Sequence, residues 1–148
     1  RLASEYIEGL NILSSMRMCA NVPCQSAIQT ALGGYQSIDD LVKENGRLRI
    51  QRDVTTDMLN GIEGIHCVKP KGAMYCFARV DEKKFNIHND EQMVLDLLSS
   101  EKILLVHGRA FNLNEGVYFR LVFLPHSDVL VPALHRIGNF FRTYKQGA

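Results

Sequence analysis

Apolar positions divide the sequence into a helical first third and a mixed α/β remainder. In the first third they recur at spacings of three and four, which indicates amphipathic helices. Asn21 is suited to cap the second helix, with Pro23 in its first turn, and Gly-Gly or Asn-Gly steps separate the segments. We therefore predict helices over residues 2–18, 21–32 and 47–60, and a short helical turn at 38–42.

After residue 64 short apolar runs alternate with helical patterns. The expected strands cover residues 65–69, 73–80, 103–107 and 116–124. A helix begins at Asn89 or Asp90 between the second and third strands, with Val94, Leu95, Leu97 and Leu98 facing a core. A final helix begins at Ser127 and places Leu130, Leu134, Ile137, Phe141 and Tyr144 along one side. The order β-β-α-β-β-α predicts an α/β sandwich with helices packed on a small sheet.

The helical first third has little sheet of its own to pack against. The first helix also has no start signal, because the chain opens inside its apolar pattern at Arg1. We therefore expect a fragment of a longer protein. In this view residues 1–62 are a helical segment that joins a large domain outside this sequence, and residues 63–148 are a small C-terminal α/β domain.

The fourth predicted strand contains a single charge. Alternation separates Val117, Phe119, Leu121 and Phe123 from Tyr118, Arg120, Val122 and Leu124, so both faces are apolar. We expect this strand to be covered on both sides. A guanidinium in such surroundings needs an anion, because its charge persists and is costly to bury unpaired. Arg120 is therefore a candidate for binding a carboxylate or phosphate, or else it forms an internal ion pair with Asp128 or Glu115.

Composition sets broad limits on function. The 148 residues are 46% hydrophobic and 22% charged, which is ordinary for one globular domain or a domain with part of another. A net charge of +1 gives no electrostatic case for nucleic acid or a membrane surface. No apolar run approaches the ~20 residues that span a bilayer, and no signal peptide is visible. We predict a cytoplasmic protein.

Motifs for metal, redox or nucleotide chemistry are missing from the sequence. The four cysteines form no C-x-x-C pair, and we expect reduced, buried thiols. The five histidines show no ligand spacing, so no metal site is predicted. Gly-rich phosphate loops and the G-x-S-x-G and H-E-x-x-H motifs do not occur.

Several local runs resemble the C-terminal part of a class I/II aminotransferase, a fold-type I enzyme that uses pyridoxal 5′-phosphate. The likeness is greatest to the bacterial glutamate–pyruvate (alanine) transaminase branch. The runs follow the family's order, cover nearly the whole chain and together are specific. They are M-R-M-C-A-N-V-P-C-Q at Met16, G-R-L-R-I-Q-R-D at Gly46, V-K-P-K-G-A-M-Y-C-F at Val68, K-K-F-N-I-H-N-D at Lys83, I-L-L-V-H-G-R-A-F-N at Ile103 and Y-F-R-L-V-F-L-P at Tyr118.

The resemblance implies roles for three residues. Arg120 would bind the α-carboxylate of the amino-acid or 2-oxo-acid substrate in a bidentate fork, as its planar, permanent charge allows. Tyr75 would lie in a loop that approaches the substrate side chain, although it can equally be a core aromatic. Asn21 would lie near the dimer interface and active site, although a plain N-cap remains open.

The resemblance also implies what this chain lacks. The family's Schiff-base lysine lies in an S-K-x-x-x-x-x-G-x-R context that no lysine here shows. We expect pyridoxal phosphate to bind the full-length, homodimeric parent, with none attached covalently to this chain, which alone would be inactive. Two other functions stay open: a free-standing module that binds small carboxylates, and a structural dimerisation domain.

Overall fold

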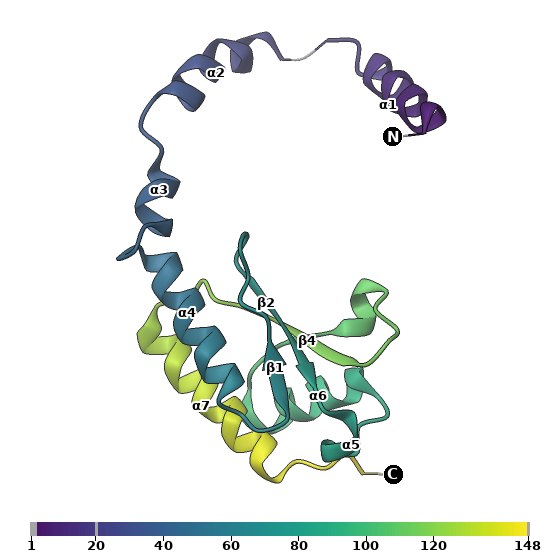
Figure 1. Cartoon of the computed structure of the whole chain (residues 1–148), viewed down its shortest axis with the longest axis vertical. Helices are drawn as coiled ribbons and strands as arrows, with labels where there is room; N and C mark the ends of the chain where they lie inside the picture. Colours follow the sequence, from purple (N-terminus) through teal and green to yellow (C-terminus); the bar gives the residue numbers. More distant parts are fainter. Residues whose placement is uncertain (1–2, 20, 148) are drawn as a thin grey trace. The chain divides into compact units, whose positions relative to one another are not determined.

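The computed structural model describes residues 3–19 and 21–147 (Figure 1). Contacts divide the chain into two compact units, Arg1–Ser37 and Ile38–Ala148. The division at residue 62 that we expect from the sequence stays a prediction.

The first unit contains helices α1 (Ser4–Met16) and α2 (Val22–Gly33). The predicted cap of α2 is confirmed: the Asn21 side chain accepts a hydrogen bond from the Cys24 N–H at 3.3 Å, and a proline lies in the first turn. Neither helix buries any described side chain. The apolar residues that the pattern assigns to one side of α1 are exposed, among them Tyr6, Leu10 and Leu13.

The second unit is built on a four-stranded antiparallel sheet in the order β1-β2-β4-β3. The strands are β1 (Ile65–Cys67), β2 (Tyr75–Val80), β3 (Val106–His107) and β4 (Val117–Val122). In the register of the sheet, Arg120 on β4 lies between Phe77 on β2 and Val106 on β3. The helices are α3 (Ser37–Val42), α4 (Arg47–Asn60), α5 (Glu82–Phe85), α6 (Asp90–Glu101) and α7 (Ser127–Thr143), with a 3₁₀ turn η1 (Gly108–Phe111). The predicted order β-β-α-β-β-α is therefore confirmed.

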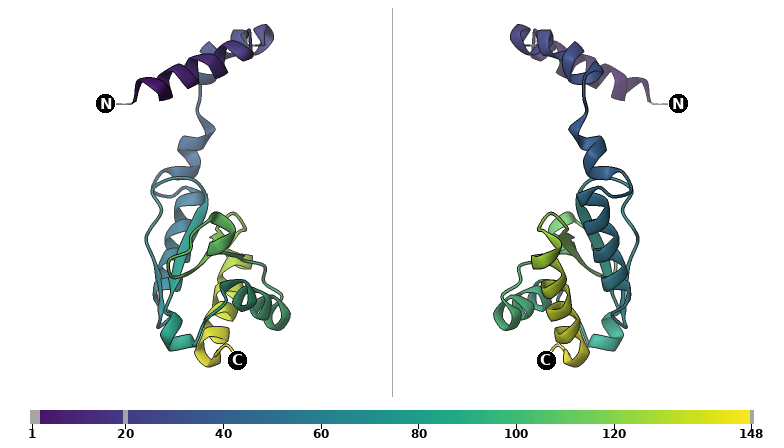
Figure 2. Two further views of the ribbon diagram at one scale, coloured as in Figure 1. Left: turned by 90° about the vertical axis from the view of Figure 1, so that its right-hand side faces the viewer. Right: turned by 90° about the vertical axis from the view of Figure 1, so that its left-hand side faces the viewer.

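One face of the sheet carries the hydrophobic core, where α4, α6 and α7 pack against the strands and one another (Figure 1 and Figure 2). Alternate residues of β4 point into it, and the Phe119 ring stacks on Phe141 of α7 at 6.1 Å between ring centroids. Four of the five apolar α7 positions predicted from spacing are buried: Leu130, Leu134, Ile137 and Phe141. Burial of this stripe, rather than helix propensity, holds α7 in place.

A buried glutamine on α4 fastens the segment that directly follows β4. The Gln51 side-chain amide donates to the Leu124 carbonyl at 3.1 Å and also to the Pro125 carbonyl. Arg47, one turn earlier, donates to the same Leu124 carbonyl at 3.0 Å. The strand that carries Arg120 therefore ends at a position fixed by α4.

The opposite face of the sheet corrects our expectation that β4 is covered on both sides. Tyr118 and Arg120 are only partly buried, and Val122 is exposed. The reason is that α4, α6 and α7 all pack on the same side, whereas alternation reports only which positions are apolar. Of the helical turns that the structure describes, η1 contributes a ring to this open face, that of Phe111.

Other predictions need smaller corrections. The third strand is only Val106–His107, at the edge of the sheet, where it pairs with β4 alone. Leu104 lies before this strand and is 76% exposed. Leu95 is exposed on α6, while Val94 and Leu97 are buried. Cys67 and Cys76 are buried as expected, but Cys19 and Cys24 lie on the exposed surface of the first unit.

Across the part of the chain that the structure describes, no helix has the length and apolar character needed to cross a membrane. In the same part, no group of three or more His, Cys, Asp or Glu residues is arranged to hold a metal ion.

Candidate functional site

Arg120 projects from the middle of β4 onto the open face of the sheet. Its Nε atom is shielded from solvent and has no hydrogen-bond partner. Buried polar groups are normally satisfied, so an unpartnered N–H of a charged side chain requires a reason.

Two aromatic rings enclose the guanidinium. Its central carbon lies 4.6 Å from the ring centroid of Tyr75 and 4.4 Å from that of Phe111. Both distances are within the range of a cation–π contact. Tyr75 begins β2 and Phe111 ends η1, so the two rings reach Arg120 from different elements. The neighbours of the guanidinium are therefore two aromatic rings, whereas a structural arginine would usually have a carboxylate of its own chain beside it.

No described residue forms an ion pair with Arg120. The internal partners considered from the sequence, Asp128 and Glu115, do not take part in the ion pairs seen among residues 3–19 and 21–147. The guanidinium donors lie in the plane of the group, so ring contacts do not consume them. A planar anion such as a carboxylate can accept from two of these donors at once. The arrangement therefore suits a carboxylate supplied from outside the sheet.

Further aromatic contacts extend from this pair across the open face. The ring centroid of Phe77 lies 5.7 Å from that of Phe111, in an edge-on contact, and 5.5 Å from that of Tyr118, in a stacked contact. Phe77 is also the register partner of Arg120 on β2. These rings give Arg120 an apolar border on a face of the sheet that stays open to solvent.

Phe111 is the residue that sequence reasoning missed. It belongs to an irregular turn, where neither the helical nor the strand period applies, so hydrophobic patterning gives no indication of its role. The one signal was its place in the I-L-L-V-H-G-R-A-F-N run that resembles the family. Its contact with Arg120 depends on how η1 folds back over β4.

The structure brings two of the three predicted site residues together. Tyr75 contacts Arg120, and at 39% exposure it is not a core aromatic of this chain. Asn21 lies in the first compact unit, where it serves as the N-cap of α2. A substrate or interface role for Asn21 stays a prediction.

Two thiols lie beneath the sheet, on the face opposite to Arg120. Cys76 follows Tyr75 on β2 and points into the core, next to Cys67 of β1. The Cys67 thiol and burial raise the pKa of Cys76 above its usual value. Cys76 therefore stays protonated at neutral pH, and a thiol in this state is a poor nucleophile.

Sequence comparisons give a consistent result. The model of the family described as aminotransferase class I and II matches residues 3–137. The glutamate–pyruvate aminotransferase AlaA of Haemophilus influenzae is 56% identical over 144 residues, which are 97% of this chain and 36% of that relative. The alanine aminotransferase of Mycobacterium tuberculosis is 54% identical over 144 residues, or 97% of this chain and 34% of that relative.

Solved structures agree with the sequence comparisons. A crystal structure of an aminotransferase from Escherichia coli superimposes with a TM-score of 0.82 at 52% identity, covering 98% of this chain and 36% of that one. Alanine aminotransferase from Pyrococcus furiosus gives a TM-score of 0.74 at 34% identity, covering 94% and 34%. This chain thus spans about a third of the length of its relatives, and it matches their C-terminal part.

Proposed function

This chain belongs to the class I and II aminotransferases, and we propose that Arg120 is its anchor for the substrate carboxylate. The observation that carries the proposal is a guanidinium between two rings, with an unpartnered Nε and no ion pair to any described residue. The α-carboxylate of an amino acid or a 2-oxo acid would complete this arrangement by accepting two hydrogen bonds. Tyr75 and Phe111 would hold the guanidinium in the required plane.

We propose that the full-length protein transfers an amino group between alanine or glutamate and a 2-oxo acid. Relatives that are more than half identical to this chain are named as glutamate–pyruvate and alanine aminotransferases. Both substrates carry a carboxylate next to the reacting carbon. One anchor can therefore serve both halves of the exchange, and it also fixes the orientation of that carbon.

The family uses pyridoxal 5′-phosphate, which acts as an electron sink when bound. None of the described lysines forms a hydrogen bond, ion pair or ring contact with Arg120, Tyr75 or Phe111. Lys43, Lys69 and Lys84 pair with Asp40, Asp53 and Glu63, and Lys102 and Lys145 donate to backbone carbonyls. None of these interactions involves the residues around Arg120. We therefore propose that the cofactor lysine lies outside this chain, and that the chain alone is inactive and carries no covalently attached cofactor.

We further propose that a large domain, outside this sequence, covers the exposed apolar side chains of α1 and α2. Exposed apolar surface of this extent marks an interaction site. In this proposal the full-length enzyme is a cytoplasmic homodimer, and Asn21 lies near its subunit interface.

The test replaces Arg120 in the full-length enzyme by lysine and by alanine. Loss of a charge-assisted bond of about 1.5–3 kcal/mol raises the KM for alanine about tenfold or more. Lysine restores the charge but not the fork, so Arg120→Lys stays defective. The matched control is Arg79→Ala, which removes an exposed arginine from the neighbouring strand. An unchanged KM in Arg120→Ala, with lowered thermal stability, would contradict the proposal and favour a structural role.

A further inference from the structure

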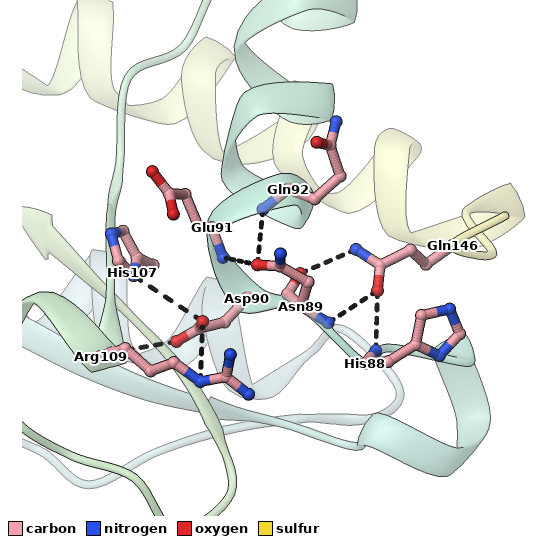
Figure 3. Close-up of polar contacts among 8 residues, drawn as sticks. All are labelled: His88, Asn89, Asp90, Glu91, Gln92, His107, Arg109 and Gln146. Carbon is pink, nitrogen blue, oxygen red and sulfur yellow. Dashed lines mark hydrogen bonds and ion pairs between the residues drawn. The ribbon is translucent and has the colours of Figure 1, made fainter. Parts of the chain in front are cut away.

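Asp90 is a buried carboxylate outside the site described above. It is 2% exposed and stands at the start of α6. Its Oδ2 accepts a hydrogen bond from the backbone N–H of Arg109 at 3.0 Å. Its Oδ1 lies 3.5 Å from the Arg109 Nε and 3.7 Å from the His107 Nδ1 (Figure 3). The Oδ1 and the His107 Nδ1 have no hydrogen-bond partner among the described residues, so the hydrogen bond from the Arg109 N–H is the contact that ties Asp90 to η1.

Helix capping does not account for this carboxylate. Asn89 already caps α6, because its side chain accepts hydrogen bonds from the N–H groups of Glu91 and Gln92 at 3.0 and 3.1 Å. The Asp90 side chain points instead toward His107 and Arg109 (Figure 3). A buried charge is costly unless it is paired, and the contacts that offset the burial of Asp90 are those to Arg109: the hydrogen bond from its backbone N–H and the 3.5 Å approach of its Nε.

The segment that Asp90 holds is the one that places Phe111. His107 ends β3, Arg109 lies within η1, and Phe111 is the last residue of that turn. The Phe111 ring then contacts the guanidinium of Arg120. The start of α6 is itself tied to the C-terminal segment, since Gln146 accepts from the N–H groups of His88 and Asn89 (Figure 3).

We propose that Asp90 is a positioning residue for the carboxylate anchor. By fixing the β3–η1 turn it keeps Phe111 against Arg120, and so keeps the guanidinium oriented for a planar anion. Supporting contacts of this kind decide whether a binding group is held closely enough to work. The inference rests on the proposed function, because it assigns Asp90 a role through Arg120.

The test uses the full-length enzyme and propionate as probe, a carboxylate that resembles alanine without its amino group. Asp90→Ala raises both the inhibition constant of propionate and the KM for alanine about tenfold, while kcat changes less than about twofold. Asp90→Asn gives a smaller increase in both, because its amide oxygen still accepts from the Arg109 N–H. This variant also serves if the alanine variant does not fold. The matched control is Asp96→Asn on the same helix, whose carboxylate accepts from the Tyr144 hydroxyl and does not touch η1.

The outcomes separate the inference from the function on which it rests. If both Asp90 variants lower thermal stability as Asp96→Asn does, yet bind propionate as the wild type does, the positioning role is overturned. Arg120→Ala would then still weaken propionate binding, and the proposed function would stand. If Arg120→Ala leaves propionate binding unchanged, the proposed function fails and this inference fails with it.

Discussion

The Phe111 ring lies 4.4 Å from the guanidinium carbon of Arg120, and no sequence period relates the two residues. Phe111 ends a 3₁₀ turn, whereas Arg120 occupies the centre of a strand. Their contact gives Arg120 one of its two aromatic neighbours without giving it a counter-charge. This relationship, together with the Tyr75 contact, leads to two predictions on substrate binding.

Replacing Phe111 by leucine in the full-length enzyme removes the π face but keeps an apolar side chain. The ring contact, worth about 0.5–2 kcal/mol, holds the guanidinium in the plane that a carboxylate requires, so its loss should raise the KM for alanine by at most about 30-fold. Steady-state kinetics measures this change. The matched control is Phe140→Leu on α7, where the ring stacks on Tyr144 away from Arg120. Equal KM values for both variants would show that Phe111 only fills space.

Substitutions of Tyr75 distinguish a role of its ring from a role of its hydroxyl. No hydrogen bond of its hydroxyl is seen among the described residues, whereas its ring lies 4.6 Å from the guanidinium carbon. Tyr75→Phe should therefore keep the KM near the wild-type value, and Tyr75→Leu should raise it about as much as Phe111→Leu does. A large defect in Tyr75→Phe would indicate that the hydroxyl contacts substrate directly.

The environment of Tyr144 predicts that the protein loses stability at alkaline pH. The Asp96 carboxylate accepts a hydrogen bond from the Tyr144 hydroxyl at 2.7 Å. Burial, together with this carboxylate, raises the pKa of Tyr144 above its ordinary value. A raised pKa in the folded state means that the stabilisation is complete below about pH 10 and is lost as the pH rises further. Tyr144→Phe should lower stability by about 1 kcal/mol at neutral pH and weaken the alkaline decline.

The measurement for Tyr144 is the thermal unfolding midpoint at about pH 8 and about pH 11. The control is Tyr6→Phe. Tyr6 is exposed on α1, so this substitution removes a hydroxyl without removing a buried contact. Parallel pH curves for wild type and Tyr144→Phe would contradict the assignment.

Gln146 holds the C-terminal segment to the start of α6. It is 4% exposed, accepts from the His88 and Asn89 N–H groups at 2.7 and 2.9 Å, and donates to the Asn89 carbonyl at 2.7 Å. Gln146→Ala leaves these backbone groups unpaired and should cost about 1–3 kcal/mol. Thermal unfolding measures the loss, with Gln92→Ala, an exposed glutamine on α6, as control. Equal midpoints for the two variants would mean that water replaces Gln146.

Several features of this protein follow from local chemistry and were predictable from the sequence. The spacing of Leu130, Leu134, Ile137 and Phe141 predicted the buried face of α7, and Asn21 predicted the cap of α2. The isolated charge of Arg120 in an apolar strand identified it as the candidate anchor. In each case the signal lies within one element, where backbone geometry alone fixes which residues share a face.

Other features were decided only by the tertiary structure. Alternation could not show that β4 has one open face, because an apolar pattern does not state what packs against it. The contact of Tyr75 with Arg120 follows from the register that pairs Phe77 with Arg120 across two strands. The contacts of Phe111 and Asp90 depend on a turn between elements. The sequence by itself thus determined the helices and strands and the isolated charge of Arg120. The tertiary structure decided that Tyr75 and Phe111 contact this charge and that Asp90 contacts η1, because contacts between distant segments leave no periodic pattern in the sequence.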